Sequence, residues 1–101
     1  MMEVVWTLGV DLDLQAIYER LDVRSSGAGD RFFEALLETT RQLQVFPQIG
    51  PVVHRGFIRR VLVFDRHYGL FYSIESRGII LHVLEDLRGA PERISQRLRQ
   101  I

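Results

Sequence analysis

The sequence predicts an α+β fold, with two N-terminal helices packed on a small antiparallel sheet and a short C-terminal helix. The first half has apolar residues at helical spacing, whereas the second half has strand-like runs separated by short turns. Such turns force antiparallel hairpins, because a parallel crossover needs about a dozen residues or more. With 101 residues, of which 47% are hydrophobic and 26% are charged, we expect one domain over residues 1–101 with its helices on one face of the sheet.

The first strand and helix are predicted from the N-terminal segment. Glu3–Thr7 (EVVWT) is rich in β-branched and aromatic residues, which predicts a short strand. The segment LDLQAIYERL that follows predicts a helix, and Thr7 or Asp11 could cap it. Its apolar positions recur at intervals of three and four residues and so define one apolar face: Leu14, Ile17, Tyr18 and Leu21.

A loop of turn-forming residues, Arg24–Gly29, leads to the second predicted helix. Asp30 is a good N-cap for this helix. The helix should end at Phe46-Pro47, because proline disfavours the helical conformation in the preceding residue and lacks an N–H donor. One apolar stripe runs along it: Phe33, Leu36, Leu37, Thr40 and Leu43.

The second half of the chain predicts four strands and a last helix. Turns at Asp65-Arg66 and Ser76–Gly78 separate the longer strands. The expected strands are Val52–His54, Phe57–Phe64, Tyr68–Glu75 and Gly78–Leu84. Phe64 and Tyr72 fall in apolar runs and are expected in the core. Pro91 opens the final helix, which carries Ile94, Leu98 and Ile101 on one face.

The composition excludes several classes of protein. There is no cysteine, which excludes disulfides and thiolate metal sites and favours an intracellular protein. The longest apolar run, Tyr68–Tyr72, is far too short to span a membrane. The start, MMEVVWTL, lacks the basic and apolar regions of a secretory signal. We therefore expect a cytoplasmic protein with no membrane partner.

The charge is distributed unevenly although the formal net charge is zero. Residues 1–50 hold four arginines and eight carboxylates, whereas residues 51–101 hold nine arginines and five carboxylates. All thirteen basic residues are arginine. Arginine suits bidentate contacts with carboxylate or phosphate, although codon bias toward arginine would give the same composition. The basic surface is therefore predicted to belong to the second half.

Four arginines are the candidate binding residues. Arg59 and Arg60 are adjacent in a strand, so their side chains point to opposite faces. One is expected on the exposed sheet face and the other near a helix carboxylate. Arg66 and Arg88 lie near strand ends, where they could meet phosphate or an acidic partner. Scattered solvated arginines are the alternative interpretation.

The remaining polar residues give weaker signals for catalysis or metal binding. The three histidines, His54, His67 and His82, have no metal-ligand spacing, and His82 is expected to pack on a sheet face. His67, beside Arg66, is the only histidine with a plausible acid–base setting, although a surface turn residue is the favoured interpretation. Glu85-Asp86 predicts a solvated turn rather than a metal site. No metal or cofactor is expected.

Several short motifs occur in a fixed order along the chain. Asp13, Leu14 and Ile17 form an Asp-Leu-x-x-Ile pattern in the first helix. Later motifs are Leu-x-x-Phe-Pro-x-x-Gly at residues 43–50, Tyr-Gly-Leu-x-Tyr at residues 68–72, and an Arg and a Pro at positions 88 and 91. In this order and spacing, from about Val4 to Leu98, the chain resembles the RelE/ParE superfamily of toxins from type II toxin–antitoxin pairs.

The resemblance implies a function without catalysis. Ribonuclease members of the superfamily cut messenger RNA on the ribosome. They tend to have an arginine where this chain has Gly69. They also have a Tyr or His near the C-terminal segment, where this chain has Leu87 and Ile94. The Tyr-Gly-x-x-Tyr form resembles the ParE branch, whose members inhibit DNA gyrase by binding. It implies a cognate antitoxin as partner, with Arg59, Arg60, Arg66 and Arg88 as contact residues. It also implies that Gly69 is a place where backbone packs closely.

Two alternatives stay open. The first is a RelE-like ribonuclease acting on ribosome-bound messenger RNA with His67, Arg59, Arg60 and Arg88. The second is a non-toxic homologue that acts as an interaction module, because ParE-like relatives often have a histidine where this chain has Glu85.

Overall fold

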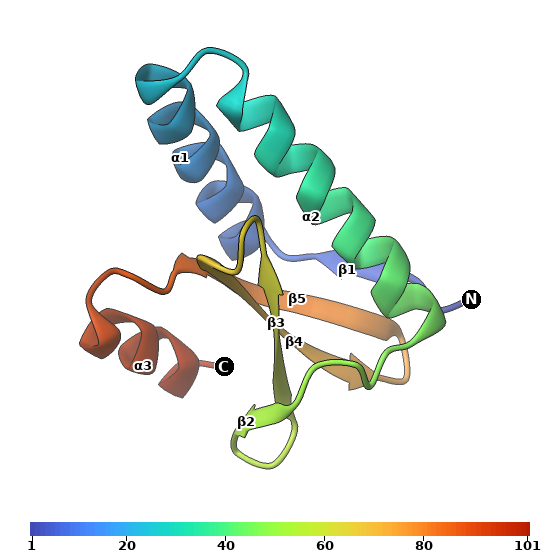
Figure 1. The fold of residues 1–101 in the computed structure, drawn as a ribbon. Coiled ribbons are helices and arrows are strands. Elements are labelled where there is room, and N and C mark those ends of the chain that lie inside the picture. Colours follow the sequence, from blue (N-terminus) through green and yellow to red (C-terminus); the bar gives the residue numbers. More distant parts are fainter.

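The computed structural model describes residues 1–101 and has the predicted α+β architecture (Figure 1). Two long helices follow a short first strand, four further strands complete the sheet, and a short helix ends the chain. The elements are β1 (Val4–Trp6), α1 (Leu8–Arg24), α2 (Ala28–Val45), β2 (Val52–His54), β3 (Ile58–Val63), β4 (Tyr68–Glu75), β5 (Gly78–Asp86) and α3 (Pro91–Arg99). The strand and helix types predicted from periodicity are confirmed.

The five strands form one mixed sheet in the order β1-β5-β4-β3-β2. The pairs β5–β4, β4–β3 and β3–β2 are antiparallel, as the short turns predict. β1 instead runs parallel to β5, with Val5 opposite Ile80. The purely antiparallel sheet is therefore wrong at this edge. No hairpin links β1 to its neighbour, so the short-turn argument does not apply to it.

The helices cover both faces of the sheet. α1 and α2 lie side by side on one face, and a core cluster of 12 buried residues fills the space beneath them, including Phe32, Leu36, Leu70 and Tyr72. Phe71 lies between two of these residues in β4 and points to the opposite face, where it packs with Leu98 of α3. The prediction that all helices share one face is therefore wrong for α3. Apolar residues at consecutive positions of β4 make both faces of this strand buried.

The connection between α1 and α2 is shorter than predicted. α1 continues to Arg24 and α2 starts at Ala28 after an N-cap at Gly27, whose φ of 83° lies in the left-handed region. Asp30 is therefore not the N-cap. Its carboxylate accepts a hydrogen bond from the Tyr18 hydroxyl, while the Asp22 carboxylate accepts one from the Gly29 N–H at 2.8 Å.

The predicted apolar stripe of α2 is correct in part. Leu36, Thr40 and Leu43 are buried, but Phe32 rather than Phe33 enters the core, and the Phe33 side chain is 37% exposed. The helix ends at Val45, directly before Phe46-Pro47, as predicted. Its C-terminal end is followed by a loop, residues 46–51, that runs along the sheet edge toward β2.

Candidate functional site

Tyr72 joins two of the sequence motifs. Its side chain is fully buried, and its hydroxyl donates to the Pro47 carbonyl at 2.7 Å and accepts from the Gly50 N–H at 3.0 Å. Burial raises the pKa of the Tyr72 hydroxyl, so it stays protonated as a donor. A Cβ at Gly50 would lie 2.6 Å from the Arg60 carbonyl oxygen. The core position predicted for Tyr72 is confirmed, and the motif residues fix the loop of residues 46–51 against β3 and β4.

Phe64, also predicted in the core, is partly buried. Its φ of 53° is unusual for a bulky residue. The ring packs edge-on against Phe32 with ring centroids 5.5 Å apart, and Tyr68 completes this aromatic cluster. The two following residues, Asp65 and Arg66, also have positive φ. The β3–β4 turn therefore presents Arg66 and His67 to solvent while Phe64 anchors the turn to α2.

Arg59 binds the same loop as Tyr72, residues 46–51. Its guanidinium donates to the Gln48 carbonyl at 3.2 Å and to the Gly50 carbonyl at 2.7 Å. The prediction of a helix carboxylate as partner is wrong for Arg59. α2 has already ended at this point, and main-chain carbonyls of the following loop face the guanidinium instead. Arg59 therefore stabilises this loop and does not lie free on a binding surface.

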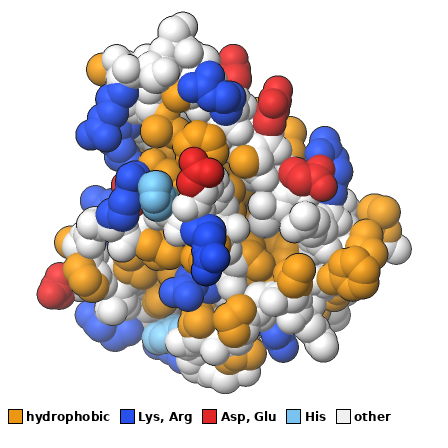
Figure 2. Space-filling model, in the orientation of Figure 1, with side chains coloured by type: hydrophobic (Ala, Val, Ile, Leu, Met, Phe, Trp, Pro, Cys, Tyr) orange, Lys and Arg blue, Asp and Glu red, His pale blue; other side chains and the backbone are white.

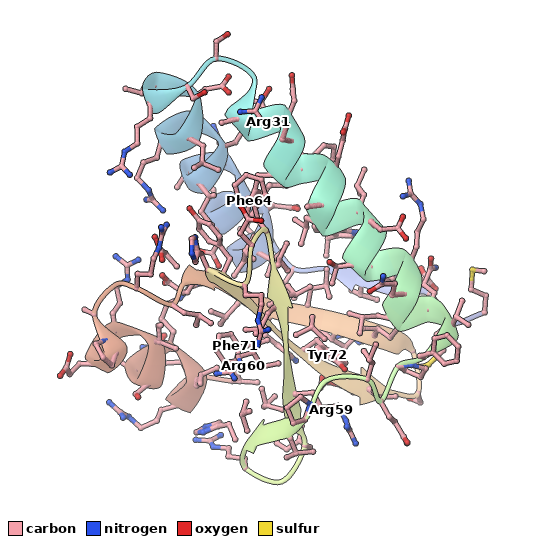
Figure 3. All side chains as sticks on the ribbon, viewed as in Figure 1. Arg31, Arg59, Arg60, Phe64, Phe71 and Tyr72 are labelled. Atoms are coloured by element: carbon pink, nitrogen blue, oxygen red, sulfur yellow. The ribbon has the colours of Figure 1, made fainter.

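Arg60 lies on the opposite face of β3 and has no carboxylate partner (Figure 3). It is half-buried, and its Nε has no hydrogen-bond partner although that atom is shielded from solvent. Its Cδ lies 3.3 Å from where a Cβ of Gly69 would stand, and Leu87 Cδ2 lies 2.9 Å from the same point. Gly69 is therefore a close-packing position, where the missing side chain makes room for Arg60 and Leu87.

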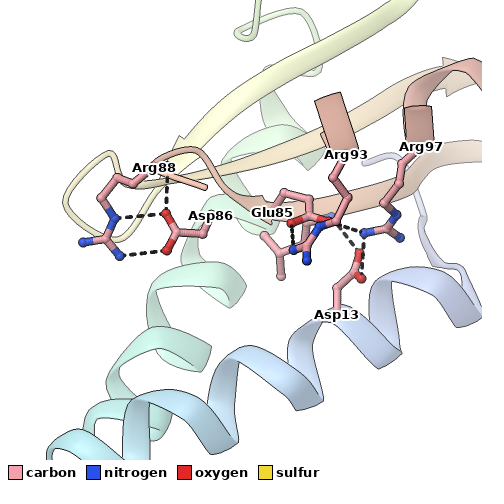
Figure 4. Close-up of polar contacts among 7 residues, drawn as sticks. Asp13, Glu85, Asp86, Arg88, Arg93 and Arg97 are labelled. Atoms are coloured by element: carbon pink, nitrogen blue, oxygen red, sulfur yellow. Dashed lines mark hydrogen bonds and ion pairs between the residues drawn. The ribbon is translucent and has the colours of Figure 1, made fainter. Parts of the chain in front are cut away.

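Arg88 is paired within the chain. Its guanidinium binds both carboxylate oxygens of Asp86 at 3.0 Å and lies 5.7 Å from the centroid of the Tyr68 ring (Figure 4). The hydrogen bond from Arg88 lowers the pKa of Asp86 and raises that of Arg88. Nearby, the His67 carbonyl accepts the Leu87 N–H at 2.8 Å.

The four predicted arginines and His67 do not converge on one point. Arg66, His67 and Arg88 lie at the end of the sheet where β4 begins and β5 ends. Arg59 pairs with Tyr72, further along β4, and faces the other side of the sheet from Arg60. The constellation expected for a ribonuclease is therefore spread over different faces and ends of the sheet.

Glu85 is buried and is not part of a solvated turn, which corrects the prediction. Its side chain is 6% exposed and accepts hydrogen bonds from Arg93 at 2.6 Å and Arg97 at 2.9 Å (Figure 4). Burial alone would raise the pKa of Glu85, but the bonds from the two arginines outweigh it and hold the pKa below its usual range. The turn interpretation failed because both partners belong to α3, which follows β5.

Asp13 extends this cluster to α1. One of its carboxylate oxygens accepts from Arg97 at 2.8 Å, and the other accepts the Leu84 N–H at 3.0 Å. The sequence motif Asp-Leu-x-x-Ile contained Asp13, but nothing local indicated that it would bind the main chain of β5. We call Asp13, Glu85, Arg93 and Arg97 the α3 clamp, because together they tie α3 to β5 and α1.

The histidines give no metal centre. His82 packs on a face of β5, as predicted, and is half-buried there. Its Nε2 lies 2.8 Å from the Ser73 Oγ, which in turn donates to Glu75 at 2.6 Å. Burial lowers the pKa of His82. His54 lies on β2 and His67 in the β3–β4 turn. No group of three or more His, Cys, Asp or Glu side chains is arranged to hold a metal ion.

None of the three helices has both the length and the apolar character required to cross a membrane.

Comparison with known proteins identifies the family. A search of curated proteins gave no match. The family model described as the ParE toxin of the type II toxin–antitoxin system, parDE, matches residues 4–98. The match spans the first strand, the helical hairpin, the whole sheet and nearly all of α3. The chain therefore belongs to the ParE toxin family of type II toxin–antitoxin systems.

Proposed function

We propose that this toxin acts by binding rather than by catalysis, that its target is DNA gyrase, and that a cognate antitoxin protein neutralises it. Family membership supports the antitoxin as partner. The toxin would meet DNA gyrase and the antitoxin in the cytoplasm. The mode of action rests on the surroundings of Gly69, whereas the gyrase target rests on the resemblance to the ParE branch.

The environment of Gly69 carries the proposal for binding. RNA cleavage needs a cation for the developing negative charge and a proton donor for the leaving oxygen. Arg60 supplies a cation beside Gly69, but the other nearest side chains are those of Leu87 and Phe71. Leu87 and Ile94, at the positions where ribonuclease relatives have a Tyr or His, pack against the small apolar cluster under α3. This arrangement favours a binding surface over an acid–base site.

The second candidate is the RelE-like ribonuclease, and the position of Arg60 is the observation that favours it. The Arg60 Cδ lies 3.3 Å from where a Cβ of Gly69 would stand, so an arginine side chain from the neighbouring strand passes beside the position where those relatives carry one. The proton donor would have to be His67, which lies exposed in the β3–β4 turn. The third candidate, a non-toxic interaction module, would keep partner binding without either activity.

Two of the four predicted contact arginines are available to a partner. Arg60 and Arg66 have no salt bridge within the chain, whereas Arg59 binds loop carbonyls and Arg88 binds Asp86. We therefore assign the contact with the antitoxin to Arg60 and Arg66. Arg59 instead stabilises the loop of residues 46–51. Binding through these charges should weaken as salt is raised.

Two parallel assays separate the candidates. Purified wild-type protein should inhibit DNA supercoiling by gyrase and should produce no position-specific cleavage of messenger RNA on programmed ribosomes. Arg60→Glu should weaken binding of the cognate antitoxin, whereas Arg41→Glu is the matched control, because Arg41 is exposed on α2 and pairs only with Glu38. Cleavage that disappears in His67→Ala would establish the ribonuclease instead. Inactivity in both assays would favour the interaction module.

A further inference from the structure

A groove runs along the seam between α1 and α2. Two adjoining hollows of about 400 and 350 Å³ form it, and both are lined by Asp11, Leu14 and Phe33. The first hollow extends to Tyr18 on α1, and the second extends to Trp6 at the end of β1. The Phe33 side chain is 37% exposed and is not part of the core cluster beneath the hairpin. The hairpin therefore has a second apolar surface, open to solvent.

The rim of this groove is acidic. Asp11 and Glu19 line it, and no arginine does. Asp30 accepts a hydrogen bond from the Tyr18 hydroxyl, which also lines the groove. That bond raises the pKa of Tyr18, and the negative charges of Asp30 and Asp22 act in the same direction. None of these four carboxylates forms a salt bridge within the chain, so the negative charge beside the groove is uncompensated.

The exposed side of α2 adds to this negative charge. Figure 2 shows acidic side chains in a row along this helix. The two arginines of α2, Arg31 and Arg41, do not line the groove, and Arg41 is paired with Glu38 at 3.1 Å. Phosphate groups or an acidic peptide would be repelled here, whereas a basic segment would be attracted.

The two helices that wall the groove determine the form of its occupant. Main-chain groups within a helix are already paired with one another, so an extended chain would find no main-chain partners here. A third helix satisfies its own main chain and binds through side chains alone. Asp11 and Glu19 lie about 12 Å apart along α1 at a rise of about 1.5 Å per residue, so a helix of about three turns spans them.

α3 shows within this molecule how such a helix is held. Leu98 enters an apolar cluster, while the arginines of the α3 clamp bind carboxylates at its border. The groove between α1 and α2 offers the same combination of apolar side chains and carboxylates, with the carboxylates free of salt bridges. A helix with apolar residues on one side and Lys or Arg beside them therefore matches it.

We infer that the groove between α1 and α2 binds a basic amphipathic helix of a partner protein. The apolar side of that helix packs on Phe33, and its Lys or Arg side chains lie at Asp11 and Glu19. This surface goes beyond the proposed function. It is separate from Arg60 and Arg66 and opposite to them in charge, so an acidic segment attracted to those arginines would be repelled here.

The test uses the full chain of the toxin and, as probe, the peptide LKKLLKLLKKLLKL, which as a helix has leucines on one side and lysines on the other. The matched peptide LEELLELLEELLEL keeps the apolar side and reverses the charge. Trp6 is the only tryptophan of the chain and borders the groove, so its fluorescence reports occupancy. The lysine peptide should shift the Trp6 emission to shorter wavelength and shield it from acrylamide, and raised salt should weaken the binding. The glutamate peptide should have no effect.

Variants of exposed residues locate the binding. Phe33→Ala should weaken binding of the lysine peptide by about tenfold or more, because it removes the central apolar contact. Glu19→Gln should weaken it by less, and the difference from the wild type should vanish at high salt. Phe46→Ala and Glu92→Gln are the matched controls and should bind as the wild type does, because they change an exposed ring and an exposed carboxylate outside the groove.

Several results would overturn the inference. These are equal binding of the two peptides, no binding of the lysine peptide, or binding that Phe33→Ala and Glu19→Gln leave unchanged. Self-association of the free toxin that Phe33→Ala abolishes would assign the groove to a second copy of the chain and would also overturn it. The gyrase and ribosome assays use neither peptide, so each of these results leaves the proposed function standing.

Discussion

The two faces of the sheet are held by different forces. On the face covered by α1 and α2, a cluster of 12 buried apolar residues includes Phe32, Leu36 and Tyr72. On the other face, the buried cluster contains only Ile58, Phe71, Val83 and Leu98, and the α3 clamp adds ion pairs at its border. Burial of apolar surface is non-directional and insensitive to pH, whereas ion pairs depend on protonation and salt.

This difference assigns separate roles to the two faces. The helical-hairpin face is expected to determine global stability. The α3 face is expected to open locally, because few apolar contacts hold the helix and its attachment depends on charge. Five predictions test this comparison, the last as a reference for the fourth.

The largest expected effect is on the hairpin face. Phe32→Ala should lower the free energy of unfolding by about 3–5 kcal/mol, since it removes a fully buried aromatic ring. Leu98→Ala is the counterpart under α3 and should cost about 2 kcal/mol, because that site lies at the border of a small cluster. Urea denaturation of both variants measures the difference. Equal costs would contradict the proposed division between the faces.

Removal of one hydroxyl on the hairpin face should have the next largest effect. Tyr72→Phe keeps the ring but leaves the buried Gly50 N–H without its acceptor, which should cost about 1–3 kcal/mol. Faster amide exchange at Gly50 would accompany the loss. Tyr18→Phe, which removes an exposed hydroxyl bonded to Asp30, is the control and should leave the unfolding midpoint unchanged.

A methyl group at Gly69 tests the packing under α3. Gly69→Ala places a Cβ 2.9 Å from Leu87 Cδ2 and 3.3 Å from Arg60 Cδ. Overpacking should cost about 1–2 kcal/mol. In a double-mutant cycle, Leu87→Ala should relieve part of that cost. Strictly additive effects would show that Leu87 is not the group that Gly69 accommodates.

Acid pH should release α3 with the smallest effect on global stability. The folded-state pKa of Glu85 lies below its ordinary value of 4.5, so its contribution is complete above about pH 4.5 and is lost as the pH falls through the lowered pKa. The protection factors of the α3 amides, which correct for the intrinsic pH dependence of exchange, should therefore fall in this range. Glu85→Gln should show fast exchange in α3 already at neutral pH, with no further acid step from this residue. High salt should act in the same direction on the wild type.

His82 provides an internal reference for that titration. Burial lowers its pKa below the ordinary value of 6.5, so the unfolded chain binds a proton more readily than the folded chain. Its effect is a loss of stability that begins as the pH falls below about 6.5, at higher pH than the Glu85 step. His82→Gln should remove this earlier step and leave the release of α3 in place.

Local patterns in the sequence were sufficient to place most elements. Val52–His54 and Tyr68–Glu75 are strands with the predicted bounds, and α2 ends before Pro47 as predicted. Proline geometry, short turns and strand alternation act over a few residues, so they can be read without knowledge of the fold. The motif order also identified the family that the family-model match shows. The sequence indicated arginines as candidate binding residues, but it did not indicate which groups of the chain would surround Arg59 and Arg60.

Only the tertiary structure decided which groups meet. The parallel pairing of β1 with β5, the face occupied by α3 and the burial of Glu85 all depend on segments far apart in the chain. Asp13 and Arg97, which form one ion pair, are separated by 84 residues. The sequence by itself determined the elements, their order and the apolar character of each strand. The physical reason for the limit is that burial and hydrogen-bond partners come from non-local packing, which no local periodicity encodes.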